Sequence, residues 1–272
     1  MVAAIRDVAG VNWNAKVPVD ESDPDFMQSL ARGLQVLEAF AVLGPAQSIA
    51  ALAGHTGLPR GVVTRCLHTL AVLGYVERRD RLFSVRPSVL RIADAYLSDR
   101  SLSALAQPVL ENLRDVVGES CSLGVLEGGD VLYVARASRS RIMSIGLHVG
   151  SRLPAWCTSM GRVLLAALPA AERDELIPPD PLPGLTPQTV RCRADVMALI
   201  DTVRSQGYAL VDQELEIGLR SIAVPVNDRR GCTLAALNVG TNALEHSASD
   251  LTERILPHLA TAATLLGAEF GR

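Results

Sequence analysis

A set of hydrogen-bond donors on one predicted helix face is the feature of this sequence that most directly suggests a chemistry. The segment 59–73 has apolar residues at helical spacing on one side and contains no acidic residue. Its other side carries Arg60, Gly61, Thr64, Arg65 and His68. Arginine, threonine and histidine side chains can donate to phosphates and to base edges. We expect this face to contact DNA; the alternative interpretation is an ordinary exposed helix face.

The elements around this helix resemble those that present a recognition helix to DNA. Ser48 is a predicted N-cap of a preceding helix, the segment 55–57 supplies the turn, and Pro59 suits a first helical position. Gly74 is predicted to end the second helix, and strands are expected at 75–77 and 82–85. The pattern predicts a winged helix-turn-helix. The tip between the strands contains three basic residues that can reach phosphates or a minor groove: Arg78, Arg79 and Arg81.

A second candidate chemistry is anion binding near residue 159. A helix is predicted over 158–168, and residues 157–161 come just before its apolar run at 163–166. Free backbone amides at Ser159 and Met160, at the start of this helix, could therefore hold a carboxylate. The alternative is that Thr158 or Ser159 only caps the helix. Trp156 could stack on an aromatic ligand or pack beneath the loop. Two arginines could neutralise an acidic ligand or simply lie on the surface: Arg141 and Arg152.

Other polar residues do not indicate an enzyme. His148 has no second histidine nearby, so a structural role is favoured and no metal is predicted. Asp212, Glu214 and Glu216 could act in acid–base catalysis, but a solvated loop or contact with Arg220 is the favoured interpretation. The sequence lacks the Gly-x-Ser-x-Gly, Gly-x-x-x-x-Gly-Lys and His-Glu-x-x-His motifs. We therefore predict no catalytic residue and no cofactor.

Composition indicates a globular protein with a local basic region. The chain has 272 residues, 49% of them hydrophobic, and a net charge of −3. Residues 27–90 nevertheless contain seven arginines against three acidic residues, and this excess coincides with the predicted helix-turn-helix. No apolar run approaches the ~20 residues of a membrane span, and the first residues do not resemble a signal peptide. We expect a cytoplasmic protein with no membrane association, and its five scattered cysteines are predicted to be reduced.

The sequence divides into four predicted regions. Residues 1–26 are expected to be a disordered acidic tail, 27–86 the winged helix-turn-helix domain, 87–106 a linker helix and 107–272 an effector-binding and oligomerisation domain. The first helix of the DNA-binding domain is expected to be capped by Ser29 and to end at residues 44–45. Its predicted apolar stripe contains Leu30, Leu34, Leu37 and Ala41, with Val36 and Phe40 beside it. After the linker, Pro108 is expected to kink or divide a helical stripe.

The C-terminal region alternates between strand-like and helical segments. Strands are predicted at 120–126, 131–135, 142–149, 221–226 and 233–239, and helices at 158–168, 194–206 and 248–270. The proline-rich segment 169–189 is expected to be surface structure with a weak helical signal at 171–176. This order predicts an α+β fold with a mainly antiparallel sheet.

Several longer motifs resemble the IclR family of bacterial transcriptional regulators. They are the segment 29–85, Gly-Leu-His-Val-Gly at 146–150, Leu-Pro-Ala at 153–155, Thr-Ser-Met-Gly-Arg at 158–162, Asp-Gln-Glu at 212–214 and Gly-Leu-Arg-Ser-Ile-Ala-Val-Pro at 218–225. The chain is most similar to the branch that governs β-ketoadipate-pathway catabolism of protocatechuate and 4-hydroxybenzoate. The resemblance covers nearly the whole chain after the tail.

This resemblance implies an N-terminal winged helix-turn-helix joined by a linker helix to a GAF-like α/β effector-binding domain. It also implies a homodimer or a dimer of dimers, and a small acid as effector. The family pocket corresponds to the Ser159 and Met160 amides, Ser221, Asn238 and Gly240, with Asp212 following an acidic family position that is Val211 here. Two positions differ, because Asn238 and Gly240 stand where serines are common, and a less polar pocket suits an aromatic ring.

Taken together, the sequence predicts a DNA-binding regulator switched by a small organic acid, most simply an aromatic carboxylate of a catabolic pathway. Its partners would be a double-stranded DNA operator, the acid, a second copy of the chain and, for an activator, RNA polymerase. One alternative is a C-terminal domain that only oligomerises, and a weaker one is a two-domain enzyme.

Overall fold

The computed structural model describes residues 24–92, 102–139 and 147–269, and these form two compact units. One unit contains the described residues up to 92, and the other contains those from 102 onward. Residues 1–23 of the predicted tail, residues 93–101 of the predicted linker helix and Arg141 lie outside the described residues. No helix among the described residues is long and apolar enough to cross a membrane.

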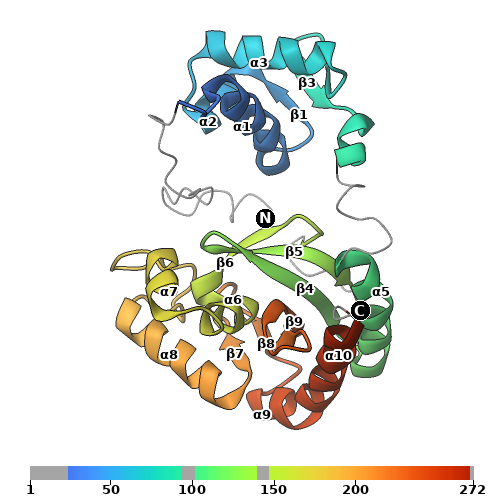
Figure 1. Ribbon diagram of the computed structural model, residues 1–272, viewed down its shortest axis with the longest axis vertical. Helices are drawn as coiled ribbons and strands as arrows, with labels where there is room; N and C mark the ends of the chain where they lie inside the picture. Colours follow the sequence, from blue (N-terminus) through green and yellow to red (C-terminus); the bar gives the residue numbers. More distant parts are fainter. Residues whose placement is uncertain (1–23, 93–101, 140–146, 270–272) are drawn as a thin grey trace. The chain divides into compact units, whose positions relative to one another are not determined.

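The described residues of the N-terminal unit include helices α1, α2 and α3 and a three-stranded antiparallel sheet (Figure 1). Its elements are α1 (Gln28–Leu43), β1 (Ala46–Ser48), α2 (Ile49–Thr56), α3 (Arg60–Val72), β2 (Val76–Arg79) and β3 (Leu82–Val85), followed by a 3-10 turn at Pro87–Val89. Strand β3 lies between β1 and β2. The side chains of Val36, Phe40, Leu52, Val63 and Leu67 form its core. The predicted winged helix-turn-helix is therefore confirmed.

Most predicted helix ends in this unit agree with the structure. Ser48 caps α2 by accepting a hydrogen bond from the Ala51 amide at 3.1 Å, and Gly57 ends that helix in the left-handed conformation. Pro59 occupies the N-cap of α3 instead of its first helical position. Ser29 is not a cap, because α1 begins at Gln28 with Met27 as its N-cap.

Two details of the predicted apolar stripes are wrong. In α1, the side that faces the core carries Val36, Ala39 and Phe40, whereas Leu30 and Leu34 are 57% and 47% exposed. In α3, Leu73 follows the end of the helix and is 60% exposed. Both errors have the same cause: an apolar residue at helical spacing does not show which side of a short helix the rest of the domain covers.

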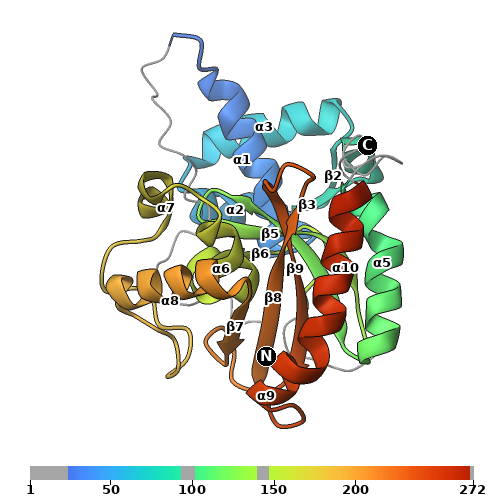
Figure 2. The ribbon, with the colours of Figure 1, turned by 60° about the horizontal axis from the view of Figure 1, so that its bottom comes forward.

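The C-terminal unit is built on one six-stranded antiparallel sheet in the order β6-β5-β4-β9-β8-β7. Its strands are β4 (Ser120–Glu127), β5 (Asp130–Ala137), β6 (Arg152–Pro154), β7 (Ala209–Asp212), β8 (Leu219–Asn227) and β9 (Thr233–Asn242). Figure 2 shows α5 (Leu102–Val117) and α10 (Leu256–Glu269) side by side along the sheet. The remaining helices are α6 (Ser159–Ala166), α7 (Ala170–Leu176), α8 (Arg193–Gln206) and α9 (Ala248–Asp250).

The sheet separates two apolar cores. Leu110 of α5 and Leu259 of α10 pack with Leu123, Leu237 and other residues in the first core. Met160 and Leu165 of α6 pack with Ile200 of α8 and small strand residues in the second. The predicted α+β fold with an antiparallel sheet is thus confirmed.

Several predicted elements of this unit need correction. Pro108 lies inside a continuous α5, which begins at Leu102 and so includes residues expected to belong to the linker. Of the predicted strand 142–149, residues 142–146 lie outside the described residues and Leu147 to Val149 are not in a strand; a strand that was not predicted, β6, follows at Arg152–Pro154. The closing helix contains a π-helical segment, Leu251–Ile255. Strands β1 and β7 were not predicted.

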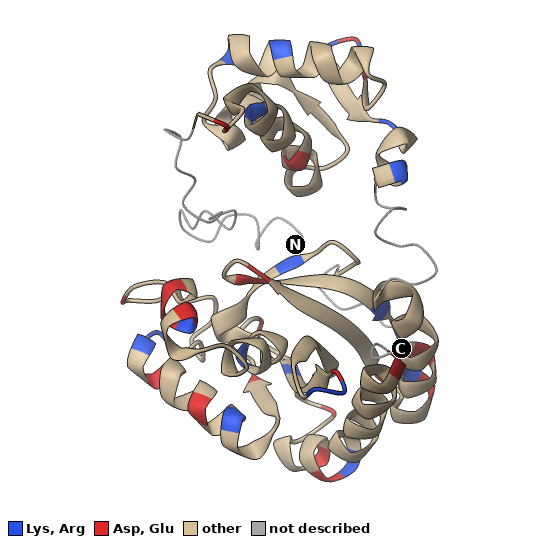
Figure 3. Cartoon of the chain, in the orientation of Figure 1, with Lys and Arg blue, Asp and Glu red and all other residues tan. Residues whose placement is uncertain are grey.

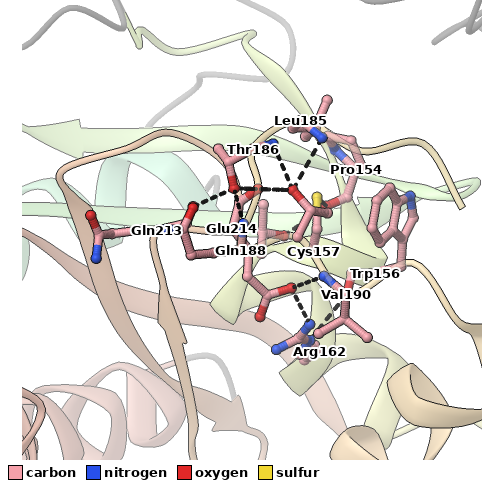
Figure 4. A network of polar contacts seen from close by, with 12 residues as sticks. Pro154, Trp156, Cys157, Arg162, Leu185, Thr186, Gln188, Val190, Gln213 and Glu214 are labelled. Atoms are coloured by element: carbon pink, nitrogen blue, oxygen red, sulfur yellow. Dashed lines mark hydrogen bonds and ion pairs between the residues drawn. The ribbon is translucent and has the colours of Figure 1, made fainter.

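The proline-rich segment 169–189 is more than surface structure. Leu182 is fully buried, and Thr189 donates to the Glu214 carbonyl at 2.7 Å. Thr186 donates to the Gln213 carbonyl, also at 2.7 Å. Figure 4 shows how this segment meets the loop that follows β7.

A buried ion pair joins these segments to α6. Arg162 donates to the Glu214 carboxylate at 2.7 Å, and the two side chains are only 3% and 8% exposed (Figure 4). The same carboxylate accepts from the Val190 amide, and Arg162 also donates to the Trp156 carbonyl. Removal of one member would leave a buried charge without its partner.

We predict that Glu214→Gln lowers the free energy of unfolding by about 3 kcal/mol, because Arg162 would stay buried without a counter-ion. Urea unfolding followed by tryptophan fluorescence measures this change. Asp115→Asn is the control, because Asp115 pairs with Arg114 on the surface and such pairs contribute ~0–1 kcal/mol. Equal effects of the two substitutions would contradict the structural role of the buried pair.

Candidate functional site

The predicted DNA-binding residues lie together on the exposed side of α3. Val63 and Leu67 are fully buried and fix the orientation of the helix. Arg60, Gly61, Thr64, Arg65 and His68 are all exposed. The Thr64 hydroxyl donates to the Arg60 carbonyl at 2.8 Å, so its oxygen remains able to accept a hydrogen bond. Figure 3 shows basic residues and no acidic residue along α3.

The three arginines of the wing differ in their local contacts. Arg78 lies 5.9 Å from the ring centre of Phe83 and donates to the Asp80 carbonyl. Arg79 pairs with Glu77 at 2.6 Å on the surface. Arg81 is exposed at the turn, where Asp80 adopts a positive φ of 55°. The pairing of Arg79 reduces the charge available for a phosphate, so Arg78 and Arg81 are the stronger candidates.

A cavity lies in the C-terminal unit beneath the start of α6. The volume of the cavity that the centre of a water molecule can occupy is ≈ 30 Å³. One water molecule requires ~10–15 Å³ by this measure. Leu147 and Leu215 belong to loops, so part of its wall is not fixed by the sheet. The lining residues are Ser120, Tyr133, Arg136, Leu147, Cys157, Thr158, Ser159, Met160, Val211, Leu215, Leu219, Ser221, Asn238 and Gly240.

The start of α6 is held tightly against this cavity. Thr158 is the N-cap and accepts from the Gly161 amide at 3.2 Å, which leaves the Ser159 hydroxyl free to donate to Ser221 at 2.9 Å. A Cβ at Gly161 would lie 2.1 Å from the Ala155 carbonyl oxygen, so only glycine permits this close approach. Ser159 and Ser221, 62 residues apart in the sequence, therefore meet at the cavity wall.

Five of the predicted effector residues line the cavity. Trp156, Arg152 and Asp212 lie elsewhere. Ser159, Met160, Ser221, Asn238 and Gly240 are lining residues. Trp156 is 2% exposed and packs in the core beneath the loop, so of its two proposed roles the structure shows packing. Arg152 pairs with Glu127 and Asp130, away from the cavity lining.

The acidic residues near β7 have structural partners. Asp212 accepts from Arg220 at 2.8 Å, and this hydrogen bond lowers the pKa of its carboxyl group. Glu214 is buried in the ion pair with Arg162. His148 contacts the Val149 carbonyl through its Nδ1 atom. The favoured contact of this region with Arg220 is thus present, and these side chains do not form an acid–base pair at the cavity.

Sequence reasoning missed the basic residue of the cavity. Arg136 lies on β5, donates to the Ser122 hydroxyl at 2.8 Å and to the Ser138 hydroxyl at 3.1 Å, and its pKa is lowered by burial. No lining residue within the described parts of the chain carries a carboxylate. A signal was present in the alternation of Ser120 and Ser122 with apolar neighbours, which marks a polar face on β4.

The cysteines are free thiols, and the one at the cavity is protected. Burial raises the pKa of Cys157, and it raises that of Cys121 to about 12. A raised pKa keeps a thiol protonated and therefore a poor nucleophile. Cys157 is consequently an apolar lining residue of the cavity.

Two family models match this chain. The IclR helix-turn-helix domain matches residues 29–80, and the C-terminal domain of the bacterial transcriptional regulator IclR matches residues 94–267. These ranges contain the α3 face and the cavity, respectively.

Curated relatives and a solved structure agree with these matches. The Pca regulon regulatory protein of Pseudomonas putida is 47% identical, with 88% of this chain and 83% of that protein covered. The p-hydroxybenzoate hydroxylase transcriptional activator of Acinetobacter baylyi is 35% identical, with 89% and 91% covered. An IclR homolog from Microbacterium hydrocarbonoxydans, crystallised with 4-hydroxybenzoate, has a TM-score of 0.76 at 27% identity and covers 89% of this chain and 98% of its own.

The winged helix-turn-helix, the separate sheet domain with its cavity and the two matches lead to one conclusion. The chain belongs to the IclR family of bacterial transcriptional regulators.

Proposed function

We propose that this regulator binds its operator through α3 and the wing, and that a small aromatic carboxylate in the cavity changes its affinity for DNA. The observation that carries the proposal is the presence in one chain of a basic α3 face and a cavity with Arg136 and no lining carboxylate. A relative that acts on the p-hydroxybenzoate hydroxylase gene and a structural neighbour bound to 4-hydroxybenzoate support the aromatic class.

The DNA-contacting residues that we propose on α3 are Arg60, Gly61, Thr64, Arg65 and His68. Side chains at these positions lie on one exposed face, so they can enter a major groove together. Gly61 has no atom within 4 Å of its Cβ position, which leaves room for a close backbone approach. Arg78, Arg79 and Arg81 of the wing would contact the phosphates.

The regulator is proposed to act as a homodimer or a dimer of dimers in the cytoplasm, where its operator is. An apolar surface on one side of α1 supports self-association. It consists of the exposed side chains of Leu30 and Leu34, together with that of the N-cap residue Met27. A two-fold dimer would read two half-sites about one helical turn apart or a multiple of it. Contact with RNA polymerase would follow if the protein activates its promoter. Binding of the effector would alter the affinity of the dimer for both half-sites.

Substitution of Arg65 tests the assignment of α3 as the recognition helix. Arg65→Ala should weaken binding to the region upstream of the regulator's own gene by about 10-fold, because a lost arginine contact costs ~1–3 kcal/mol. A gel shift at fixed salt concentration measures this loss. Arg32→Ala removes one positive charge from α1 of the same unit and should change the affinity much less. Equal losses in both variants would indicate general electrostatics and contradict the assignment of α3.

The second prediction concerns the cavity. At 100 times its Kd, a specific acid stabilises the folded protein by about 2.7 kcal/mol, so 4-hydroxybenzoate or protocatechuate should raise the unfolding temperature. Gly240→Leu should remove this shift by filling the cavity, since Gly240 is a lining residue with Leu219 3.8 Å from its Cβ position. Differential scanning fluorimetry with a panel of aromatic acids measures both effects. No shift with any acid would instead support a C-terminal domain that only oligomerises.

A further inference from the structure

Two polar residues that line the cavity, Arg136 and Asn238, belong to one row of side chains across three neighbouring strands. In the sheet register, Ser122 of β4 pairs with Arg136 of β5 on one side and with Asn238 of β9 on the other. These three residues point to the same side of the sheet because directly paired residues share a face. The cavity therefore has a cation at one end of this row and a carboxamide at the other.

Arg136 has unused hydrogen-bonding capacity and no counter-ion among the described residues. It donates to two neutral hydroxyls, those of Ser122 and Ser138. A guanidinium has five N–H donors, so these two hydrogen bonds leave donors available. Removing a cation from water without an opposite charge is unfavourable, and a carboxylate in the cavity would compensate for it.

Asn238 is the second polar residue of the cavity that lacks a hydrogen-bonding partner for one of its atoms among the described residues. Its side chain is 8% exposed, and its Oδ1 atom is buried without a hydrogen-bond donor among the described residues. A carboxamide can accept through its oxygen and donate through its nitrogen, which matches a hydroxyl group that both donates and accepts. A ligand without a donor would leave the oxygen unpaired, and this gives discrimination between otherwise similar ligands.

We propose that Arg136, positioned by Ser122 and Ser138, binds the carboxylate of the effector, and that Asn238 hydrogen-bonds a hydroxyl on its ring. The assignment rests on the proposed function and narrows it: the effector is a hydroxylated aromatic acid, and its carboxylate faces β5. The amides that open α6 then lie beside the ring of the ligand.

The start of α6 is the competing carboxylate site, and the structure favours Arg136 over it. A helix N-terminus provides a partial positive charge equivalent to roughly half an elementary charge, whereas Arg136 provides a full one. In the first turn of α6, the Thr158 and Ser159 hydroxyls and the Gly161 amide are already engaged, because Thr158 accepts from Gly161 and Ser159 donates to Ser221, so the competing site would rest on the backbone amides of Ser159 and Met160. If the carboxylate lay there, substitution of Arg136 would leave the preference for a carboxylate over an amide unchanged.

Isothermal titration of the full chain with matched ligands tests this orientation. The ligands are 4-hydroxybenzoate, the neutral 4-hydroxybenzamide and 4-fluorobenzoate, which cannot donate a hydrogen bond, together with their 3-substituted isomers. We expect the wild-type protein to prefer the hydroxy acid at least about 10-fold over each matched compound. Arg136→Gln should reduce the acid-to-amide preference to within about 3-fold, and Asn238→Ala should do the same for the hydroxy-to-fluoro preference.

Controls separate recognition from folding. Arg152→Gln removes an arginine of the same unit that pairs with Glu127 and Asp130, and Asn112→Ala removes an exposed asparagine of α5; both should keep the wild-type preferences. Arg136→Lys retains the charge and should keep most of the acid-to-amide preference, even if Arg136→Gln unfolds.

The outcomes distinguish this assignment from the proposed function. If the hydroxy acids bind but Arg136→Gln leaves the acid-to-amide preference unchanged, or Arg136→Lys loses this preference as fully as Arg136→Gln, the Arg136 charge does not bind the carboxylate. An equal loss of the hydroxy and fluoro acids in Asn238→Ala would overturn the hydroxyl assignment. If no acid of either series binds the wild-type protein, the proposed aromatic effector itself is wrong.

Discussion

Pairing of β4 with β9 decides which side chains share the space beneath α6. Residues 120–124 pair antiparallel with residues 236–240, more than 110 positions away in the sequence. One face of these strands carries Leu123 and Leu237 into the core under α5 and α10, and the other face brings Ser122 beside Asn238. A shift of one residue in this register would exchange the two faces, placing polar groups in the core and removing the cavity's polar wall. The buried leucines therefore fix the register that assembles the polar side of the cavity.

Helix α6 completes the cavity because it is attached to several segments at once. Its N-cap, its close approach at Gly161 and the Arg162–Glu214 ion pair connect it to the loop before it, to the segment ending at Val190 and to the loop after β7. The loop that carries Leu215 is thus attached to α6 through its neighbour Glu214, whereas the described residues of the loop that carries Leu147 form no ion pair to α6. A fixed helix and sheet beside one less constrained loop could hold the polar end of a ligand while admitting its ring.

Local sequence patterns predicted the helix-turn-helix well because its signals are short-range: the Ser48 cap, the turn at Gly57 and the alternation of buried and exposed residues on α3. In the other unit, the same kind of signal located α6, α8 and the β4–β5 hairpin. Arg136 and Ser122 were missed because their partnership depends on strand pairing, which a single sequence does not show. Conversely, Arg152 and Trp156 had suitable chemistry but different surroundings, an ion pair and an apolar core. Glu214 appeared to be part of a solvated loop because its partner Arg162 is 52 residues away.

We propose a switch in which one chain binds DNA with α3 and an acid with the cavity, and each binding event alters the affinity for the other ligand. Thermodynamic linkage requires the effect to be reciprocal, so the most direct measurement is a paired titration. The operator Kd is measured with and without saturating 4-hydroxybenzoate, and the 4-hydroxybenzoate Kd with and without saturating operator. We expect both constants to change by the same factor, about 5- to 150-fold for a typical coupling of ~1–3 kcal/mol. Tight binding of both ligands with neither constant changed would contradict it.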